Sequence, residues 1–434
     1  MKKNTPLIVF FYLITVTGLA QQSYTPSTGN LENRNWFEAA KLGMFIHFGV
    51  YTQLNDSNEA WTMRKYSIAD YEKVAEKFDP EHFDAKEIVA TANRLGFRFI
   101  TITTKHHDGF CLFDSKYTSW TIIHYGKYRK DIIKELTNEC HKQGIKIHFY
   151  YSLLDWHHPD FVFYKEDGGV YDKQLPNPQR NEQKYFQYME NQLTELLTNY
   201  DTVDGIWFDG YWSKNKQRYP FEKIYSLIHR LQPACLIHNN HDMFYINGED
   251  KMGYALYTPF PQNDYDNDPI LKQMPLEAMD MASDKWGYYS KQISKPATVL
   301  IQNTVKVVCN NATFLLNTGL LPDGSLDRNF IDTMNIVHAW LKENGETIYG
   351  TRAGEIPVQE WGGSTQKGNK LYIHLINIRS TELQLPVLSK KVKRIIYFND
   401  KNKVGYSKND IGILLQIDTS KQNKIDTIIE VDFE

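Results

Sequence analysis

The fold of this chain is decided by Thr103-Thr104-Lys105-His106-His107-Asp108-Gly109-Phe110, read together with the residues before it. This stretch directly follows Phe97-Arg98-Phe99-Ile100-Thr101-Ile102, an apolar and partly β-branched run. Such a run predicts a buried parallel strand. Two imidazoles and a carboxylate therefore lie at the carboxyl end of a strand, which is where α/β barrels place their functional groups.

The same arrangement occurs twice more in the sequence. Asp204-Gly205-Ile206-Trp207-Phe208-Asp209-Gly210 places Asp209 at the end of a predicted strand and before a glycine. Phe45-Ile46-His47-Phe48-Gly49 places His47 in the same way. Because the carboxyl ends of barrel strands meet on one face, we expect these side chains to share a single polar pocket.

Strand patterns alternate with helical patterns over most of the chain, which predicts βα units around a parallel sheet. We expect an incomplete or distorted (β/α) barrel of seven or eight strands, because the patterns of the later strands are less regular. The predicted strands are Gly43–Val50, Phe97–Thr103, Ile145–Ser152, Val203–Asp209, Ala234–Asn239, Leu276–Met281 and Thr313–Asn317, and the predicted helices are Asn35–Ala40, Asp84–Leu95, Asp131–Gln143, Gln183–Asn199, Phe221–Leu231 and Asp327–Asn344.

The pattern changes after about Gly350 to short alternating runs without helical signals, which predicts an antiparallel β-sandwich. The start of the chain has the features of a signal peptide, with two lysines, a short apolar run and small residues before Gln21. The expected organisation is therefore a signal peptide over residues 1–20, a barrel over 21–350 and a sandwich over 351–434. We expect an exported protein, periplasmic or extracellular, or lysosomal in a eukaryote.

The composition restricts the classes of partner. The formal net charge of −3 gives no electrostatic reason to expect binding to nucleic acid or to an anionic membrane. No segment after the signal is long and apolar enough to span a bilayer. The 9 Trp and 28 Tyr suit a carbohydrate partner, although aromatic side chains also fill large cores. The four cysteines are widely spaced, which suggests buried thiols rather than a disulfide framework or a metal site.

Asp209 is the best candidate for a nucleophile, and a structural carboxylate that caps a turn is the alternative. Sugar transfer with retention needs a carboxylate about 5–5.5 Å from a second carboxyl group. His47, His106 and His107 could bind sugar hydroxyls, because a neutral imidazole offers one donor and one acceptor. They could also be core residues or metal ligands together with Asp108 or Asp209, so a metal-dependent hydrolase is a second hypothesis.

Taken together, these stretches resemble the α-L-fucosidases of glycoside hydrolase family 29 over roughly residues 30–355. The resemblance implies a barrel followed by a sandwich and a retaining mechanism that uses no metal or cofactor. It implies that Asp209 is the nucleophile. It also implies a fucose pocket formed by His47, Trp61, His106, His107, a tyrosine of the Tyr150-Tyr151 pair (we favour Tyr151), Trp207 and Trp286. The matching stretches are Trp36-Phe37, residues 41–49, 105–110 and 113–115, Tyr150-Tyr151-Ser152 with Asp155-Trp156, residues 207–210, Trp286-Gly287-Tyr288, residues 314–317 and residues 322–324.

At three positions the sequence departs from the family pattern, and these positions bear on which sugar is bound and on catalytic activity. Ala60 replaces the glutamate that commonly precedes the residue matching Trp61, and Glu59 stands one position earlier. His241 replaces an arginine, and Phe260 replaces a glutamate that is often the general acid. The candidate replacements for that acid are Glu249, which we favour, then Asp264 and Glu277.

The sequence therefore predicts an exported retaining exo-glycosidase that acts on α-L-fucosides or a closely related sugar, with a glycan as its partner. A catalytically weak or inactive glycan-binding relative is the first alternative, and the metal-dependent hydrolase is the second. Linkage preference and oligomeric state are left open.

Overall fold

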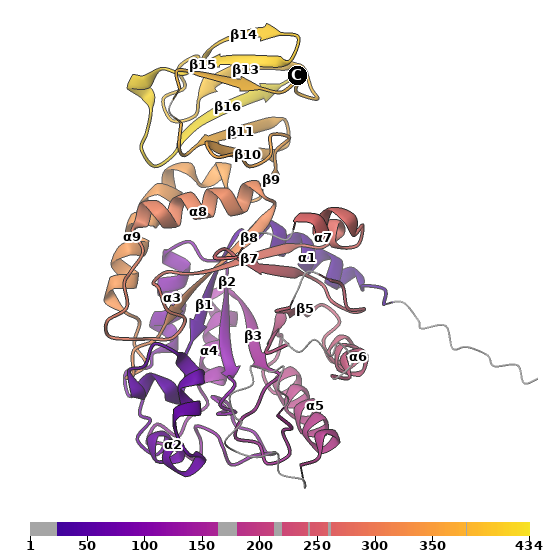
Figure 1. Cartoon of the computed structure of the whole chain (residues 1–434), viewed down its shortest axis with the longest axis vertical. Coiled ribbons are helices and arrows are strands. Elements are labelled where there is room, and N and C mark those ends of the chain that lie inside the picture. Colours follow the sequence, from indigo (N-terminus) through magenta and orange to yellow (C-terminus); the bar gives the residue numbers. More distant parts are fainter. Residues whose placement is uncertain (1–23, 164–179, 212–218, 242–243, 259–261, 379) are drawn as a thin grey trace, which may run out of the picture.

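A computed structural model describes residues 24–163, 180–211, 219–241, 244–258, 262–378 and 380–434, without the side chains of residues 262–264. A barrel forms the larger part of the molecule, and an antiparallel β-sandwich stands at one end of it (Figure 1). The predicted signal peptide lies outside the described residues. In the part of the chain that is described, no helix has both the length and the hydropathy that a membrane span requires.

The barrel is a sheet of eight parallel strands in the order β5-β4-β3-β2-β1-β8-β7-β6. The ring is nearly closed, because a single parallel bridge between His238 and Lys251 joins β5 to β6. The predicted barrel fold is confirmed. The strands are β1 (Leu42–His47), β2 (Phe99–Lys105), β3 (Lys146–Ser152), β4 (Gly205–Asp209), β5 (Leu236–Asn239), β6 (Met252–Ala255), β7 (Leu276–Met281) and β8 (Ala312–Gly319).

Strand β6 was not among the strands that the sequence predicted, because four residues that include a glycine give a weak strand pattern. Gly253 is required there, since a Cβ atom on it would lie 2.2 Å from Cε1 of His238 on the neighbouring strand. The residues that link β5 directly to β6 contain no helix within the part that is described. This junction is therefore the irregular side of the barrel.

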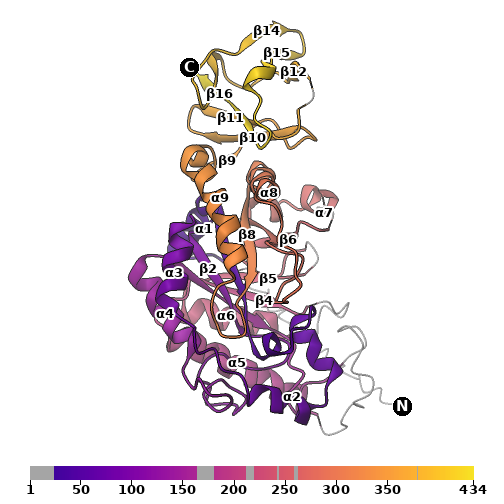
Figure 2. The same ribbon diagram turned by 90° about the vertical axis from the view of Figure 1, so that its left-hand side faces the viewer.

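The helices surround the barrel (Figures 1 and 2), and several of them begin at a side-chain cap. Asp84 and Asp131 accept backbone N–H groups at the starts of α3 and α4, which satisfies donors that a helix leaves free. The helix expected at Asn35–Ala40 is longer and begins after Ser27. The helices are α1 (Thr28–Ala40), α2 (Ile68–Ala75), α3 (Ala85–Arg94), α4 (Ile132–Gln143), α5 (Glu182–Thr198), α6 (Phe221–Leu231), α7 (Gln262–Asn267), α8 (Ala297–Cys309) and α9 (Arg328–Asn344).

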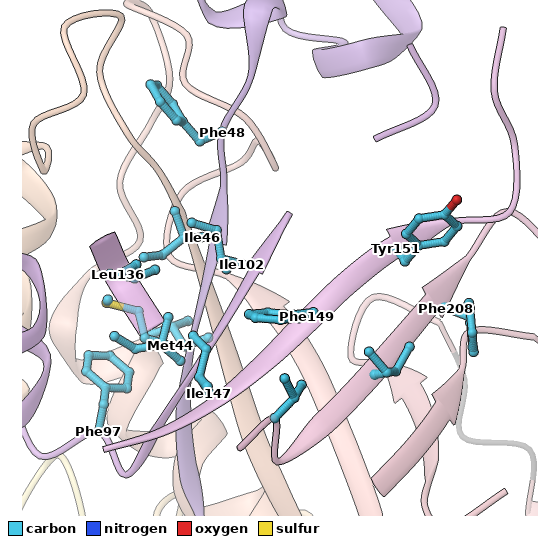
Figure 3. Packing of buried hydrophobic residues seen from close by; sticks show 14 of the residues in the cluster. Met44, Ile46, Phe48, Phe97, Ile102, Leu136, Ile147, Phe149, Tyr151 and Phe208 are labelled. Carbon is cyan, nitrogen blue, oxygen red and sulfur yellow. The ribbon is translucent and has the colours of Figure 1, made fainter. Parts of the chain in front are cut away.

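Buried side chains form separate layers outside and inside the barrel. Ile102, Ile147 and Phe149 pack outward in the layer that also contains Leu136 of α4 (Figure 3). A second cluster fills the interior of the barrel and includes Phe45, Tyr150, Trp207, Met279 and Leu315. Successive strand residues point to opposite faces, so neighbours such as Tyr150 and Tyr151 enter different layers. This alternation decides which side chains reach the pocket.

The C-terminal part contains a five-stranded and a three-stranded antiparallel sheet. Its own apolar core includes Leu371, Ile373, Leu415 and Ile429. The predicted sandwich is therefore confirmed as an architecture, and it packs on α8 through β10 (Figure 2). Its strands are β9 (Arg352–Ala353), β10 (Gly362–Lys367), β11 (Lys370–Leu375), β12 (Glu382–Leu385), β13 (Val392–Tyr397), β14 (Gly405–Asn409), β15 (Gly412–Gln416) and β16 (Thr427–Phe433).

Candidate functional site

A cavity of about 220 Å³ opens at the carboxyl ends of the barrel strands. It brings together side chains that are far apart in the sequence, as expected for a barrel mouth. Five of the predicted site residues other than Asp209 line it: His47, Trp61, His107, Trp207 and Trp286. Its full lining is Phe45, His47, Glu59, Trp61, His107, Tyr150, Trp207, Asp209, Asn240, Ala255, Tyr257, Met279 and Trp286.

Asp209 is the last residue of β4, and neighbouring groups fix both of its carboxylate oxygens. The Tyr150 hydroxyl donates to Oδ2 at 2.7 Å, and Asn240 Nδ2 donates to Oδ1 at 3.0 Å. The Gly210 N–H also donates to Oδ1, at 2.8 Å. Burial raises the pKa of Asp209, and these donors oppose that rise by stabilising the charged form. The carboxylate is therefore held in one orientation at the cavity wall.

The hydrogen bonds of His47 and His107 assign their tautomers. Asn317 Nδ2 donates to the Trp286 carbonyl, so the amide oxygen accepts from His47 Nδ1 at 2.6 Å. The Ser152 hydroxyl donates to the Leu154 carbonyl, so its oxygen accepts from His107 Nδ1 at 2.6 Å. In both rings Nδ1 carries the proton, and Nε2 is the hydrogen-bond acceptor.

His106 has the opposite tautomer. The backbone N–H of His107 donates to His106 Nδ1 at 2.8 Å, so the ring carries its proton on Nε2. That N–H lies between the Tyr150 hydroxyl, 3.4 Å from Nε2, and Glu59 Oε2, 3.5 Å from it. His106 lies beside the cavity rather than in its lining. The three rings together thus offer two acceptors and one donor.

All three imidazoles are neutral at physiological pH. Burial lowers the pKa of His47 to about 4 and that of His106 to about 4. Burial also lowers the pKa of His107 well below its ordinary value, and the nearby His106 adds to this effect. Neutral donors and acceptors suit hydroxyl groups, because they make directed hydrogen bonds without placing a net charge on the ligand.

His47, Glu59 and His106 are the described residues that come closest to a metal-binding set, with ligand atoms within 4.8 Å of one another. A nitrogen that binds a metal must offer a lone pair, whereas His106 Nε2 carries a proton in this arrangement. Ligation would require His106 to lose the hydrogen bond from the His107 N–H. The present hydrogen bonds therefore fit hydroxyl recognition better than metal coordination.

Trp207 forms an aromatic wall of the cavity. Its ring stacks on Tyr150 on one side, with centroids 5.5 Å apart, and on His238 on the other, at 4.8 Å. The indole N–H donates to Glu277 Oε1 at 2.7 Å, and Glu277 also pairs with Lys251 at 2.5 Å. Glu277 thus lies below Trp207 in the barrel interior. It does not line the cavity where a leaving group would need a proton.

Glu59 is a cavity residue that was not among the predicted site residues. Its backbone lies in the left-handed region at φ +48°, and it precedes the buried Ala60. A non-glycine residue with this backbone is strained, and such strain is often found at functional sites. Gly287 makes room, because a Cβ atom there would lie 3.1 Å from Glu59 Cγ. The signal in the sequence was that this glutamate stands one position before Ala60, where the family commonly has its glutamate.

Besides His106, two predicted site residues lie outside the cavity lining. Tyr151 points into the outer layer, where its hydroxyl donates to Gln192, and its neighbour Tyr150 lines the cavity instead (Figure 3). The choice of Tyr151 over Tyr150 is therefore corrected by strand alternation.

Glu249, the favoured general acid, lies outside the cavity and is almost fully buried. It accepts hydrogen bonds from Tyr225, His241 and the Ile246 N–H. A carboxylate held by three donors in this place has no access to a leaving group, so this assignment is also corrected. The side chain of Asp264 and all of Phe260 lie outside the described residues.

The comparisons with known proteins agree on one family. A family model described as alpha-L-fucosidase matches residues 12–346. The α-L-fucosidase of Dictyostelium discoideum is 26% identical over 375 residues, which cover 80% of this chain and 78% of that protein. The plasma α-L-fucosidase of Homo sapiens is 27% identical over 352 residues, with 76% and 72% covered.

Solved structures agree with the sequence comparisons. The α-L-fucosidase isoenzyme 1 from Paenibacillus thiaminolyticus has a TM-score of 0.83 and 31% identity, covering 94% of this chain and 100% of that one. An α-L-fucosidase from Bacteroides thetaiotaomicron, 24% identical, shares the fold with a TM-score of 0.79 and covers 95% of this chain and 96% of its own. The match over residues 12–346 shows that this chain belongs to the α-L-fucosidase family.

Proposed function

We propose that this protein is an exported retaining exo-α-L-fucosidase in which Asp209 is the nucleophile. The observation that carries the proposal is the cavity itself, where one oriented carboxylate lies among neutral histidines and aromatic rings. Acceptors and donors on His47, His106 and His107 suit the hydroxyls of a sugar, and Trp286 suits its apolar face, including the methyl group of fucose. Trp207, whose ring stacks on Tyr150 and His238, contributes to the cavity wall.

In the proposed first step, Asp209 attacks the anomeric carbon, and the bond to the leaving oxygen breaks as that oxygen takes up a proton. The covalent glycosyl–enzyme is then hydrolysed by water. A fucosidase of Bacteroides thetaiotaomicron with this fold is recorded as a trapped covalent intermediate with 2-fluoro-fucosyl fluoride. The same trapping on this chain, followed by mass spectrometry of the peptide that contains Asp209, tests the proposal directly.

We propose Glu59 as the proton donor, with a second role in binding a hydroxyl. Among the described side chains, Asp209 and Glu59 are the carboxyl groups that line the cavity. Burial raises the pKa of Glu59 to about 7, so much of it is protonated near neutral pH. A general acid works best with a pKa near the working pH. Asp264 is the rival candidate that the mutational test must separate from Glu59.

The two neighbouring tyrosines provide a matched pair of variants. Tyr150→Phe removes the hydroxyl that donates to Asp209, and we expect kcat/KM for an aryl α-L-fucoside to fall about tenfold or more. Tyr151→Phe removes only a hydroxyl that donates to Gln192, so we expect unchanged kinetics and a slightly lower melting temperature. Steady-state kinetics and thermal unfolding of both variants measure the difference. A greater kinetic loss in Tyr151→Phe would contradict the assignment of Tyr150 to the site.

Metal removal tests the hydroxyl-binding role of the histidines. We expect dialysis against EDTA to leave turnover unchanged, because His106 presents a proton rather than a lone pair to Glu59. Elemental analysis of the purified protein should find no stoichiometric zinc, manganese or iron. Loss of activity on dialysis and its recovery on adding one of these metals would favour the metal-dependent hydrolase.

A further inference from the structure

The segment that follows β5 reaches Asp209 through Asn240. The backbone N–H of Asn240 donates to the Phe208 carbonyl at 2.9 Å, which continues the pairing of β4 and β5 by one residue. Its side-chain Nδ2 donates to Asp209 Oδ1 at 3.0 Å. Asn240 therefore holds one oxygen of the proposed nucleophile, while Tyr150 holds the other.

A buried carboxylate ties this segment to the rest of the barrel. Glu249 Oε1 accepts from the Tyr225 hydroxyl at 3.0 Å and from His241 Nε2 at 3.0 Å, and Oε2 accepts from the Ile246 N–H at 2.9 Å. Tyr225 lies on α6, and its hydroxyl also accepts from Asn239 Nδ2 at 3.3 Å. We call Glu249, His241 and Tyr225 the latch.

The latch contacts the residues on both sides of Asn240. Asn239 donates a hydrogen bond to Tyr225, and His241 donates one to Glu249. The residues before and after Asn240 are therefore both held in place. A buried carboxylate is costly unless it is fully hydrogen-bonded, and here three donors satisfy Glu249. Its position beside the residue that contacts Asp209 points to a role in placing that contact.

We propose that Glu249 is a positioning residue that, with His241 and Tyr225, holds Asn240 against Asp209. The proposal rests on the proposed function, because it assigns Asp209 the role of nucleophile. It also gives a joint role to His241, which stands in place of the family's arginine, and to the buried Glu249.

The proposal has a consequence for pH dependence. The groups that face Asp209 are His106 and His107 after β2, Tyr150 of β3, the Gly210 N–H, Asn240 after β5 and Tyr257 after β6. Glu59 lines the same cavity. The bond from Asn240 stabilises the charged carboxylate and so lowers the pKa of Asp209. The nucleophile must be deprotonated. A broken latch should therefore raise this pKa and move the acidic limb of the kcat/KM profile to higher pH.

The test uses the full-length enzyme, an aryl α-L-fucoside and the variants Glu249→Gln, Tyr225→Phe, Asn240→Ala and Glu249→Gln/Asn240→Ala. A glutamine at position 249 keeps the shape of the side chain but replaces one acceptor oxygen by an NH₂ group. Whichever oxygen is replaced, the NH₂ group faces a donor: Tyr225 and His241 at one position, or the Ile246 N–H at the other. We expect Glu249→Gln to shift the acidic limb upward by about half to one pH unit, which lowers kcat/KM on the acidic side about threefold to tenfold. Tyr225→Phe should give a smaller shift in the same direction.

The double variant shows whether Glu249 acts through Asn240. If it does, Glu249→Gln adds no further shift once Asn240→Ala is present, because coupled residues are not additive. The control is Glu430→Gln in the sandwich, which removes an equally buried and ion-paired carboxylate far from the cavity. It should lower the melting temperature and leave the acidic limb in place.

Each outcome has a separate meaning. The positioning role is wrong if the wild-type enzyme is active but the acidic limb of its kcat/KM profile does not shift in Glu249→Gln and Tyr225→Phe. It is also wrong if the shifts of Glu249→Gln and Asn240→Ala add up in the double variant. If Glu249→Gln does not fold, the position of the acidic limb in Tyr225→Phe tests the proposal instead, because that variant keeps the Glu249 carboxylate. A wild-type protein without fucosidase activity instead contradicts the proposed function itself.

Discussion

Asp209→Asn should lower kcat by several orders of magnitude while the protein keeps its fold. The amide has nearly the shape of the carboxylate but cannot attack the anomeric carbon, so the covalent intermediate cannot form. The oxygen that remains can still accept from Asn240 and Gly210 or from Tyr150. Steady-state kinetics with an aryl α-L-fucoside, together with thermal unfolding, measure both parts of this expectation.

Azide provides the control for the nucleophile. In Asp209→Gly the missing carboxylate leaves space at the cavity wall, and a small anion can take its place as the attacking group. We expect azide to restore part of the turnover and to release a fucosyl azide. Near-normal turnover in Asp209→Asn would show that another residue attacks the sugar, and the proposed mechanism would then be wrong.

Glu59→Gln should show the second-largest effect, and the effect should depend on the leaving group. A proton donor matters most when the leaving oxygen is a poor leaving group, so natural fucosides should slow far more than an activated aryl fucoside. The acid must be protonated, and burial places the pKa of Glu59 at about 7. Wild-type activity should therefore fall as the pH rises through about 7, and Glu59→Gln should lack this alkaline limb.

Asp264→Asn serves as the comparison for the proton donor. If Glu59 is the acid, this variant should slow natural and activated fucosides by similar factors and keep the alkaline limb. The reverse result, with the leaving-group dependence confined to Asp264→Asn, would move the role of the acid to Asp264. Glu59 would then keep only its place beside His106 as a hydroxyl-binding residue.

The strands and the residues at their ends could be predicted from the sequence. Phe99–Lys105 and Gly205–Asp209 are short strands that start with apolar and β-branched residues and end in a polar one, and burial in a parallel sheet favours such apolar runs. The positions of Asp209, His47 and His107 at the barrel mouth follow from that pattern alone. The family resemblance adds Trp207 and Trp286, and both line the cavity.

Only the tertiary structure decided the remaining members of the site. Glu59 reaches the cavity because its backbone adopts φ +48° and Gly287 leaves room for it. Glu249 is withdrawn from the cavity because its carboxylate accepts from His241 and Ile246 of its own β5–β6 segment and from Tyr225 of α6. Alternation along a strand is local and can be read from the sequence. The place of Glu59 depends on Gly287, which is far away in the chain, and the partners of Glu249 depend on how the β5–β6 segment folds back and packs on α6. The folded barrel therefore determines both.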